Sequence, residues 1–346
     1  MLTAVERTLG PSRGPTCGEP DIAVSFTDSF PRRSSLRFLG LNQAAFDEES
    51  FYLLDDAGRR VRLDVDELGE PCELVCEQGV TTLPLLLSIV GLRLLRKEHV
   101  LLHSCAFSYR GAGTVVAGWQ KGGKTEMLLA FMAAGAQYLA DEWTIISPDG
   151  RTVYGLPGIV QIWSWHLRHV PPYWKRLRRS ERARLRLLRL YQRLYREMPE
   201  VGGTTDFPLA ALHRLSLEGG NPLIGQVRSS PERLFGDHVS HAPSPLNRLF
   251  LATSWEGATT VRPLTGADLA HRMVSSLEWE RRELMAAYDQ FKYAFPDRRN
   301  DWIENAAKRE HEILSRAFSS KLAHEVLHPY PVPLQDLHAV TAPLYE

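Results

Sequence analysis

The sequence predicts an α/β protein whose core surrounds a phosphate-binding loop, with a small β-rich domain before it and a helical region after it. Three observations support this fold class. An apolar, β-branched run at 114–117 leads into a glycine-rich loop at 118–125, and good helix formers follow as far as residue 134. Short strand-like segments separated by turns fill residues 21–78. Long stretches with helical character lie within residues 265–323.

These patterns divide the chain of 346 residues into three parts. Residues 1–20 contain Pro and Gly and are expected to be loose. Residues 21–97 are expected to form the β-rich N-terminal domain, ending in a helix. Residues 98–346 are expected to form the P-loop domain, which carries a basic helical insertion at 168–198 and C-terminal helices at 265–323.

Within the N-terminal part, apolar and β-branched residues gather in short runs between turns such as Asp55-Asp56-Ala57-Gly58. The predicted strands are 22–26, 35–38, 51–54, 60–65 and 72–76, and the predicted helix is 82–96. Further along, residues 249–253 are expected to form another core strand. Residues 265–294 and 301–323 are expected to form two long helices, the first capped by Thr265.

The loop from Gly118 to Thr125 matches G-x-x-x-x-G-K-[ST], the phosphate-binding P-loop. Its glycines allow successive backbone N–H groups to point at a phosphate, and the helix that follows adds the positive end of its dipole. Lys124 is expected to reach the β- and γ-phosphates of ATP, and the Thr125 hydroxyl to hold Mg²⁺. The other candidates for nucleotide contact are Trp119, Gln120, Lys121, Gly122, Gly123 and Glu126.

Two adjacent carboxylates, Asp141 and Glu142, follow the next predicted strand, at 136–140. Ligands of α/β sheets bind beyond the carboxyl ends of strands, so both carboxylates are expected at the site. Asp141 is the candidate proton acceptor, and either carboxylate can serve Mg²⁺. His103 lies between two strand-like stretches. It is either a core histidine or a group that orients Asp141 or hydrogen-bonds the transferred group.

Taken together, His103, the P-loop followed by Glu126, Gly135, and Ala140-Asp141-Glu142 resemble the catalytic core of the HPr kinase/phosphorylase family. That family has a His before the P-loop, a Glu directly after G-K-[ST], and Ala-Asp-Asp at the end of the next strand. The resemblance covers about residues 100–145. It implies an HPr-kinase-like P-loop core that transfers a phosphoryl group from ATP to a hydroxyl. A serine of a peptide or small protein is the acceptor implied, and homo-oligomers are expected on the same ground.

The chain also departs from the family pattern. Glu142 replaces the second Asp, which lengthens the side chain by one methylene. The later Glu-x-Arg-Gly-Leu-Gly signature remains only as Tyr154-Gly155-Leu156-Pro157-Gly158-Ile159, without its Glu and Arg, so no reverse phosphorylase reaction is predicted. A loose match at residues 245–248 suggests Arg248 as a charge-stabilising arginine. Recognition of HPr itself is not expected, and a sugar or other small metabolite remains the alternative acceptor.

Residues 168–198 are rich in Arg and Lys, and Leu185 and Leu188 begin one apolar face. This segment is either a surface helix with a solvated face or a platform for an anion. The anion could be an acidic peptide, a phosphorylated small molecule or nucleic acid. Lys plus Arg and Asp plus Glu both number 41, which argues against general nucleic-acid binding. The most apolar run, 83–95, is too short to span a membrane.

Several alternatives accompany this interpretation. His324-Glu325-Val326-Leu327-His328 matches H-E-x-x-H, a zinc metalloprotease motif when it lies on a helix. Cys72 and Cys76 with His103 and Cys105 could supply four zinc ligands. A regulator that binds nucleotide without catalysis is the non-enzymatic alternative. The four cysteines lack regular spacing and the N-terminus lacks an apolar signal sequence, so a cytoplasmic protein is expected.

Overall fold

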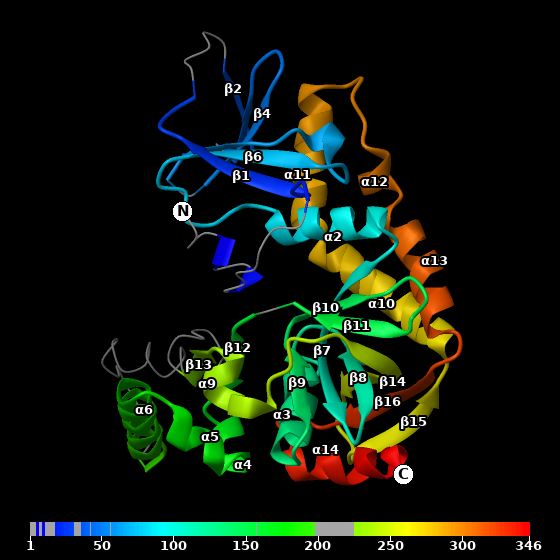
Figure 1. Ribbon diagram of the computed structural model, residues 1–346. Coiled ribbons are helices and arrows are strands. Elements are labelled where there is room, and N and C mark those ends of the chain that lie inside the picture. The colour runs from blue at the N-terminus through cyan, green and yellow to red at the C-terminus, as the bar shows by residue number, and fades with distance from the viewer. Residues whose placement is uncertain are drawn as a thin grey trace.

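The computed structural model describes residues 5–6, 9–10, 18–30, 36–41, 43–55, 57–156, 158–197 and 225–346. The structure is mixed α/β, as predicted. Figure 1 shows an N-terminal sheet at the top and a second sheet, which carries the P-loop, below it. A set of helices links the two sheets, and most of the loose segment predicted at 1–20 lies outside the described residues.

The N-terminal sheet is largely the predicted one. Its strands are Ile22–Thr27 (β1), Arg37–Leu39 (β2), Ala44–Phe46 (β3), Phe51–Leu54 (β4), Arg60–Arg62 (β5) and Cys72–Glu77 (β6). Their order is β1-β6-β5-β4-β3-β2, and only the β1–β6 pair is parallel. β3 is an additional strand, because its Ala-Ala-Phe sequence carries no β-branched residue that would indicate it. The predicted strand 60–65 stops at Arg62, and Val65–Glu67 (η1) forms a 3-10 turn.

This sheet shares its hydrophobic core with the C-terminal helices. Phe51 of β4 meets Phe291 of α11 (Arg282–Ala294) edge to face, with ring centroids 5.7 Å apart. Asp66 forms an ion pair with Arg298 at 2.6 Å. Helix α2, Leu86–Arg96, buries one face in the same core and connects the sheet to the P-loop region. The first and last thirds of the chain therefore fold together.

The P-loop sheet contains eight described strands. They are Val100–Tyr109 (β7), Ala112–Ala117 (β8), Gln137–Ala140 (β9), Trp143–Ile146 (β10), Thr152–Gly155 (β11), Ser244–Ser254 (β14), Thr260–Leu264 (β15) and Leu322–His328 (β16). The order is β11-β10-β7-β8-β14-β16-β15, and β9 also pairs with β7. β14 runs parallel to β8 and β16, while the other pairs are antiparallel. The loop that follows β8 thus lies at the carboxyl edge of the parallel group.

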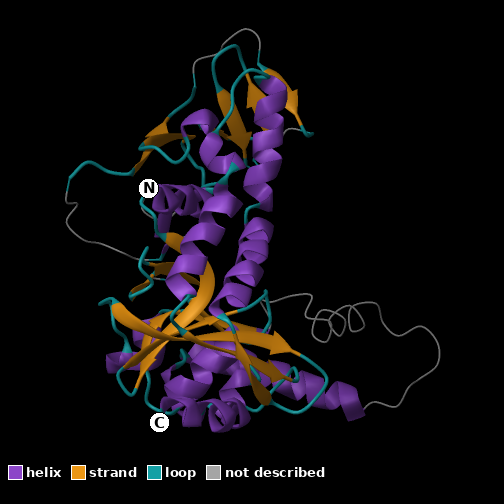
Figure 2. Ribbon diagram, turned by 90° about the vertical axis from the view of Figure 1, so that its right-hand side faces the viewer, coloured by secondary structure: helices purple, strands orange, loops and turns teal. Residues whose placement is uncertain are grey.

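Helices cover both faces of this sheet, as Figure 2 shows. On one face α3 (Lys124–Ala133) packs against β7 and β8 and against α14 (Leu334–Thr341). On the other face lie α2, α10 (Gly266–Glu280) and α13 (Ala306–Phe318). The strand predicted at 114–117 and the helix predicted at 125–134 are therefore confirmed as β8 and α3.

Two predictions about the C-terminal helices are wrong in part. The stretch 265–294 is two helices, α10 and α11, which meet at Arg281. Arg281 is buried there in an ion pair with Glu310 of α13. This ion pair holds the junction of α10 and α11 against α13. The stretch 301–323 contains α12 (Asp301–Glu304) and α13, but the chain then enters β16 at Leu322, where pairing with β14 and β15 replaces the helix. Thr265 does cap α10, since its hydroxyl oxygen accepts from the Asp268 N–H at 3.0 Å.

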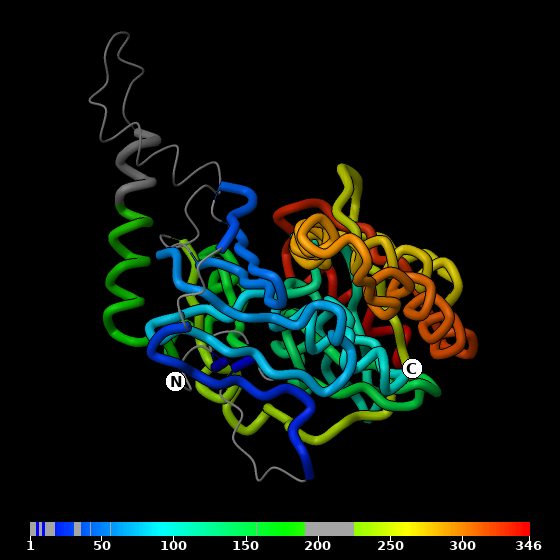
Figure 3. The backbone as a smooth tube through the Cα atoms, turned by 90° about the horizontal axis from the view of Figure 1, so that it is seen from above, coloured from blue at the N-terminus to red at the C-terminus, as the bar shows by residue number. Residues whose placement is uncertain are grey.

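The basic stretch forms α4 (His166–His169), α5 (Pro171–Arg176) and α6 (Arg179–Glu197) at one edge of the molecule (Figure 3). Leu185 and Leu188 are buried, as the apolar face predicts. Beside these helices lie β12 (Val160–Trp163), β13 (Gln226–Ser229) and α9 (Pro231–Phe235). Several arginines donate to backbone carbonyl oxygens of these elements: Arg176 to Leu234, Arg184 to Gln226 and Arg189 to Ser164. Gly202-Gly203-Thr204-Thr205, which the sequence offers as a hinge beside this basic stretch, lies outside the described residues.

Candidate functional site

The P-loop connects β8 to α3 and curls around the ammonium group of its own lysine. Lys124 Nζ donates to the carbonyl oxygens of Gly118 and Trp119, each at 3.0 Å. Gly123, the N-cap of α3, has φ +108°, a left-handed conformation that favours glycine. Burial lowers the pKa of Lys124. An ammonium has three N–H donors, so Lys124 retains one for a ligand in the loop.

His328 supports this loop from behind. It is the last residue of β16, and its Nε2 lies 3.0 Å from the carbonyl oxygen of Gly122. The metalloprotease alternative is therefore wrong. His324 and His328 lie on a strand rather than a helix, where four residues span roughly 13 Å, too far apart to share a zinc ion. One residue of the motif, His328, does contact the P-loop, through the carbonyl oxygen of Gly122 rather than through a zinc ion.

Asp141 and Glu142 occupy a break between two strands that pair with the same partner. β7 pairs with β10 through residues 100–103 and with β9 through residues 106–108. Between these segments the Glu142 carbonyl accepts from the Ser104 N–H at 3.0 Å, and Glu142 has φ +77°. The predicted strand 136–140 is confirmed as β9, and Asp141 and Glu142 follow its end. The chain then continues into β10 along the same partner strand, and the carboxylates lie in the break between the two pairings, a known use of strand irregularities beside active sites.

Asp141 is the most deeply buried carboxylate of the site, with 2% of its surface exposed. Its Oδ1 accepts from the Thr125 hydroxyl at 3.2 Å, and Oδ2 has no hydrogen-bond partner among the described residues. Burial, reinforced by the nearby charge of Glu142, raises the pKa of Asp141 to about 7. A carboxyl group with a pKa in this range can accept a proton near neutral pH.

His103 forms a second polar group with two carboxylates. Its Nδ1 lies 2.6 Å from Glu280 Oε1, and its Nε2 lies 3.1 Å from Glu142 Oε2. Burial opposes protonation of the ring, but the hydrogen bonds to Glu142 and Glu280 outweigh it and raise the pKa of His103. The hydrogen bond from His103 in turn lowers the pKa of Glu142. Trp143 stacks on the imidazole, with ring centroids 5.0 Å apart.

Glu280 had no signal in the sequence. It ends α10, 177 positions after His103, and also accepts from Gln120 Nε2 at 3.1 Å. Only the packing of α10 on the sheet brings it to the P-loop. The two neighbouring carboxylates differ in character, because the hydrogen bond from His103 lowers the pKa of Glu142 while burial raises the pKa of Asp141.

The lining of the site also contains a second buried pair, His166 and Glu126. His166 Nε2 lies 3.0 Å from Glu126 Oε1, and His166 Nδ1 accepts from the Trp163 N–H at 3.0 Å. Since Nδ1 is an acceptor, the ring proton lies on Nε2 and is donated to Glu126. His166 lowers the pKa of Glu126 in spite of burial. Glu126 is thus occupied by its hydrogen bond with His166. No sequence pattern indicated His166 as a residue of this site.

These groups surround one pocket of about 260 Å³. Its lining includes His103, Glu142, Thr125, Asp141, Trp163, Gln226 and Tyr330. Lys121 also lines it. Trp119 lies at the margin, half exposed, with its ring centroid 5.8 Å from that of the exposed Trp279. Of the predicted nucleotide contacts, Gln120, Lys121, Gly123, Lys124, Thr125 and Glu126 therefore line this pocket.

Arg248 does not join them. It lies on β14 opposite Thr114, three positions before the register pair Leu251–Ala117 that adjoins the loop. Its guanidinium stacks on Tyr345, 4.9 Å from the ring centroid. The role suggested for Arg248 has no support in this geometry, because the side chain is engaged at the other end of the strand.

The four-ligand zinc set is also not assembled. Cys72 and Cys76 lie in the N-terminal sheet, whereas Cys105 lies on β7 and donates to the Lys124 carbonyl oxygen at 3.1 Å. Within the described ranges, no three or more His, Cys, Asp or Glu residues are grouped as a metal site. A Mg²⁺ ion that arrives with a nucleotide needs only one or two protein carboxylates and takes its other ligands from phosphates and water. The oxygens of Thr125, Asp141 and Glu142 fit that requirement.

Comparison with protein-family models and with curated proteins finds no match to this chain. Among the described residues, no helix is both long and apolar enough to cross a bilayer. The arrangement itself can bind an anion in the P-loop, and it presents a buried base beside that anion.

Proposed function

We propose that this protein is an ATP-dependent phosphotransferase that moves the γ-phosphoryl group to a hydroxyl, with a serine of a peptide or small protein as acceptor. The observation that carries the proposal is the position of Asp141. A buried carboxylate with a raised pKa is hydrogen-bonded to the P-loop threonine and has one oxygen without a partner among the described residues. The HPr-kinase-like pattern around His103 and the P-loop supports the same reaction.

In the proposed reaction, the acceptor hydroxyl attacks the γ-phosphorus and its proton passes to Asp141. The new O–P bond forms as the bond from the γ-phosphorus to the β,γ-bridging oxygen breaks, and ADP leaves. Lys124 and the loop N–H groups balance the charge of the phosphates. Mg²⁺, when bound, supplies further neutralisation of the phosphate oxygens, with Thr125, Glu142 and Asp141 as its available protein ligands.

His103 is a positioning residue in this scheme. Its two carboxylate partners fix the ring, and the ring fixes Glu142 beside Asp141. Glu126 and His166 also line the P-loop pocket. Trp163 and Tyr330, which line it too, offer aromatic faces for the nucleoside. The proposal does not include a reverse phosphorylase reaction. It places the protein in the cytoplasm, where ATP is present.

The nucleotide site is tested by thermal unfolding of wild type and Lys124→Ala. Mg·ATP at about 100 times its dissociation constant should stabilise the wild type by about 2.7 kcal/mol. The Lys124→Ala variant should lose this shift, because its buried ammonium is gone. Lys308→Ala is the matched control, since Lys308 is exposed on α13 and does not line the P-loop pocket, so the shift should stay in place. No shift in the wild type with ATP, GTP or pyrophosphate would contradict a nucleotide site.

The rate of transfer should rise with pH through about 7. Asp141 must be deprotonated to accept the hydroxyl proton, and its pKa is raised to about 7 by burial and by Glu142. Below that pH the base is protonated and kcat/KM should fall about tenfold per pH unit. The measurement is kcat/KM for labelled phosphate transfer across this range. ATP-induced stabilisation measured at the same pH values shows whether binding accounts for the change. A rate that does not fall below pH 7 would exclude Asp141 as the base.

A further inference from the structure

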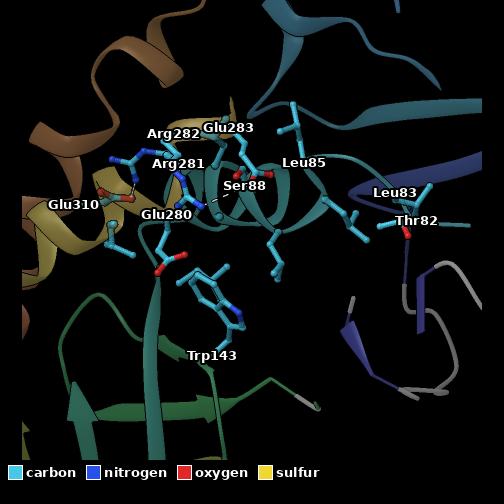
Figure 4. A pocket seen from close by; sticks show the side chains of 16 residues that line it. Thr82, Leu83, Leu85, Ser88, Trp143, Glu280, Arg281, Arg282, Glu283 and Glu310 are labelled. Atoms are coloured by element: carbon cyan, nitrogen blue, oxygen red, sulfur yellow. Dashed lines mark hydrogen bonds and ion pairs between the residues drawn. The ribbon is translucent and has the colours of Figure 1, made fainter. Parts of the chain in front are cut away.

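A second cavity lies beside the P-loop pocket, between α2 and the junction of α10 and α11 (Figure 4). Its volume is about 280 Å³, against about 260 Å³ for the P-loop pocket. Leucines of α2 and α10 line it, together with Leu101 of β7 and Trp143 of β10. Polar side chains complete the lining: Thr82, Ser88, Glu280, the exposed Arg282 and Glu283, and the buried ion pair of Arg281 with Glu310. A cavity with apolar walls and a charged margin suits an apolar group that belongs to a more polar ligand.

The cavity shares a wall with the candidate active site. Glu280 lines it and also lies 2.6 Å from His103 Nδ1. Trp143 lines it and stacks on the His103 ring. In Figure 4 both side chains stand between α2 and the strands below it. A group bound in this cavity would therefore contact Glu280 and Trp143, the same two side chains that hold His103.

Exposed aromatic side chains connect the two cavities across the surface. The half-exposed Trp119 of the P-loop lies against Trp279 of α10, itself 44% exposed. The Arg282 guanidinium stacks on Trp279 at 4.5 Å from the ring centroid, and Arg282 also lines the second cavity. This path of rings and a cation runs from the phosphate loop to the cavity. Trp and Arg are the residue types most enriched at the centres of protein–peptide contacts.

We propose that the second cavity is a specificity pocket for the acceptor, and that it takes an apolar side chain of a peptide a few residues from the phosphorylated serine. The inference rests on the proposed kinase function and deepens it, because it selects a peptide over a small metabolite. A single acceptor that occupies both cavities must have two groups joined by a chain. An extended peptide advances roughly 3.3 Å per residue, so a few residues link neighbouring pockets. The donor nucleoside is then expected against the aromatic side chains of Trp163 and Tyr330, which line the P-loop pocket.

The test uses short, soluble peptides of equal charge that contain one serine, with a single leucine moved through the positions on either side of it. Labelled ATP reports transfer by the full-length protein. The wild type should prefer one leucine position over the all-alanine peptide by on the order of 10-fold in kcat/KM, mainly through KM. This comparison requires no variant.

Two substitutions on α2 then test whether the preference for leucine arises in the second cavity. Gly91 lines the cavity, and a Cβ there would meet only Leu101, at 3.8 Å and beyond. Gly91→Leu should fill the cavity and abolish the preference for leucine, while transfer to the alanine peptide stays at the wild-type rate. Gly91→Ala is the matched control and should keep the preference, because one methyl group leaves most of the volume open.

The outcomes separate this inference from the proposed function. Transfer to all peptides without any leucine preference would overturn the specificity pocket and leave the kinase intact. A preference that survives Gly91→Leu would also overturn it, because the leucine would then bind elsewhere. If Mg·ATP stabilises the protein but no peptide is phosphorylated, the peptide acceptor is wrong. If Mg·ATP also has no effect, the kinase proposal itself fails.

Discussion

Asp141→Asn should reduce phosphoryl transfer by about 10²- to 10⁴-fold and, at the same time, stabilise the fold at neutral and alkaline pH. The loss of rate is the contribution expected of a general base, since an amide cannot accept the hydroxyl proton. The Asn side chain keeps an oxygen for the Thr125 hydroxyl, so the P-loop contact that wild type makes at 3.2 Å can persist. Binding of Mg·ATP, measured by thermal shift, should therefore change far less than the rate.

The gain in stability follows from the raised pKa. In the unfolded chain the Asp141 carboxyl has a pKa of 3.8, and in the folded protein about 7. The folded state holds the proton more tightly, so the favourable contribution is complete below pH 3.8 and is lost as the pH rises through 7. Above that pH the buried charge costs up to about 4 kcal/mol, and we expect Asn to recover about 1–3 kcal/mol of it.

Unfolding of both proteins between pH 4 and pH 8 checks this expectation. The advantage of Asn should be largest at pH 8 and should shrink toward pH 4. Asp149→Asn provides an opposite control, because hydrogen bonds from Arg151 and Ser147 lower the pKa of Asp149 and its ionised form favours folding. Full activity in Asp141→Asn would remove the residue from the mechanism. A loss of stability at pH 8 would contradict the raised pKa.

The second large effect is expected for Gly123→Ala. A Cβ at this position would lie 1.9 Å from His328 Nε2 and 2.5 Å from Cε1, and the backbone has φ +108°. The left-handed conformation alone costs an L-residue about 1–2 kcal/mol. The clash adds to this, because His328 is fully buried and hydrogen-bonded to the Gly122 carbonyl. We expect a loss of at least about 3 kcal/mol in unfolding free energy, together with loss of the ATP-induced shift.

Gly135→Ala isolates the backbone contribution. Gly135 ends the same loop–helix unit with φ +89°, and a Cβ there meets nothing within 4 Å. It should cost only the conformational penalty and preserve ATP binding. The double variant Gly123→Ala/His328→Ala should recover part of the stability by relieving the clash. Equal destabilisation by Gly123→Ala and Gly135→Ala would mean that His328 does not press on the loop as described.

The P-loop itself could be read from the sequence because its determinants are contiguous. Residues 114–134 carry the strand pattern, the glycines, the lysine and the helix formers, and the structure forms β8, the loop and α3 there. The signals that specify this unit are neighbours along the chain, although β8 also pairs with β7 and with the distant β14. The five N-terminal strands were predictable for the same reason, since each is a short run of apolar residues between turns.

Other elements were misjudged because a local pattern was compatible with two structures. His324 to His328 has helical spacing for zinc ligands, yet pairing with β14 and β15 makes it a strand. The sequence predicts the strand 136–140 and the carboxylates that follow it. It does not predict that the chain then continues into β10 along the same edge of β7. In both cases long-range hydrogen bonds decided the outcome, and no short segment records its distant partner.

The sequence by itself determined the phosphate loop, the α/β class and the presence of His103, Asp141 and Glu142 near that loop, because these depend on local order along the chain. Only the tertiary structure decided what surrounds them. Glu280, His166 and His328 reach the site from helices and strands far along the chain. Burial of Asp141 among them raises its pKa, and burial depends on packing of the whole core. Local sequence therefore fixed the chemical groups, and packing fixed their partners and their proton affinities.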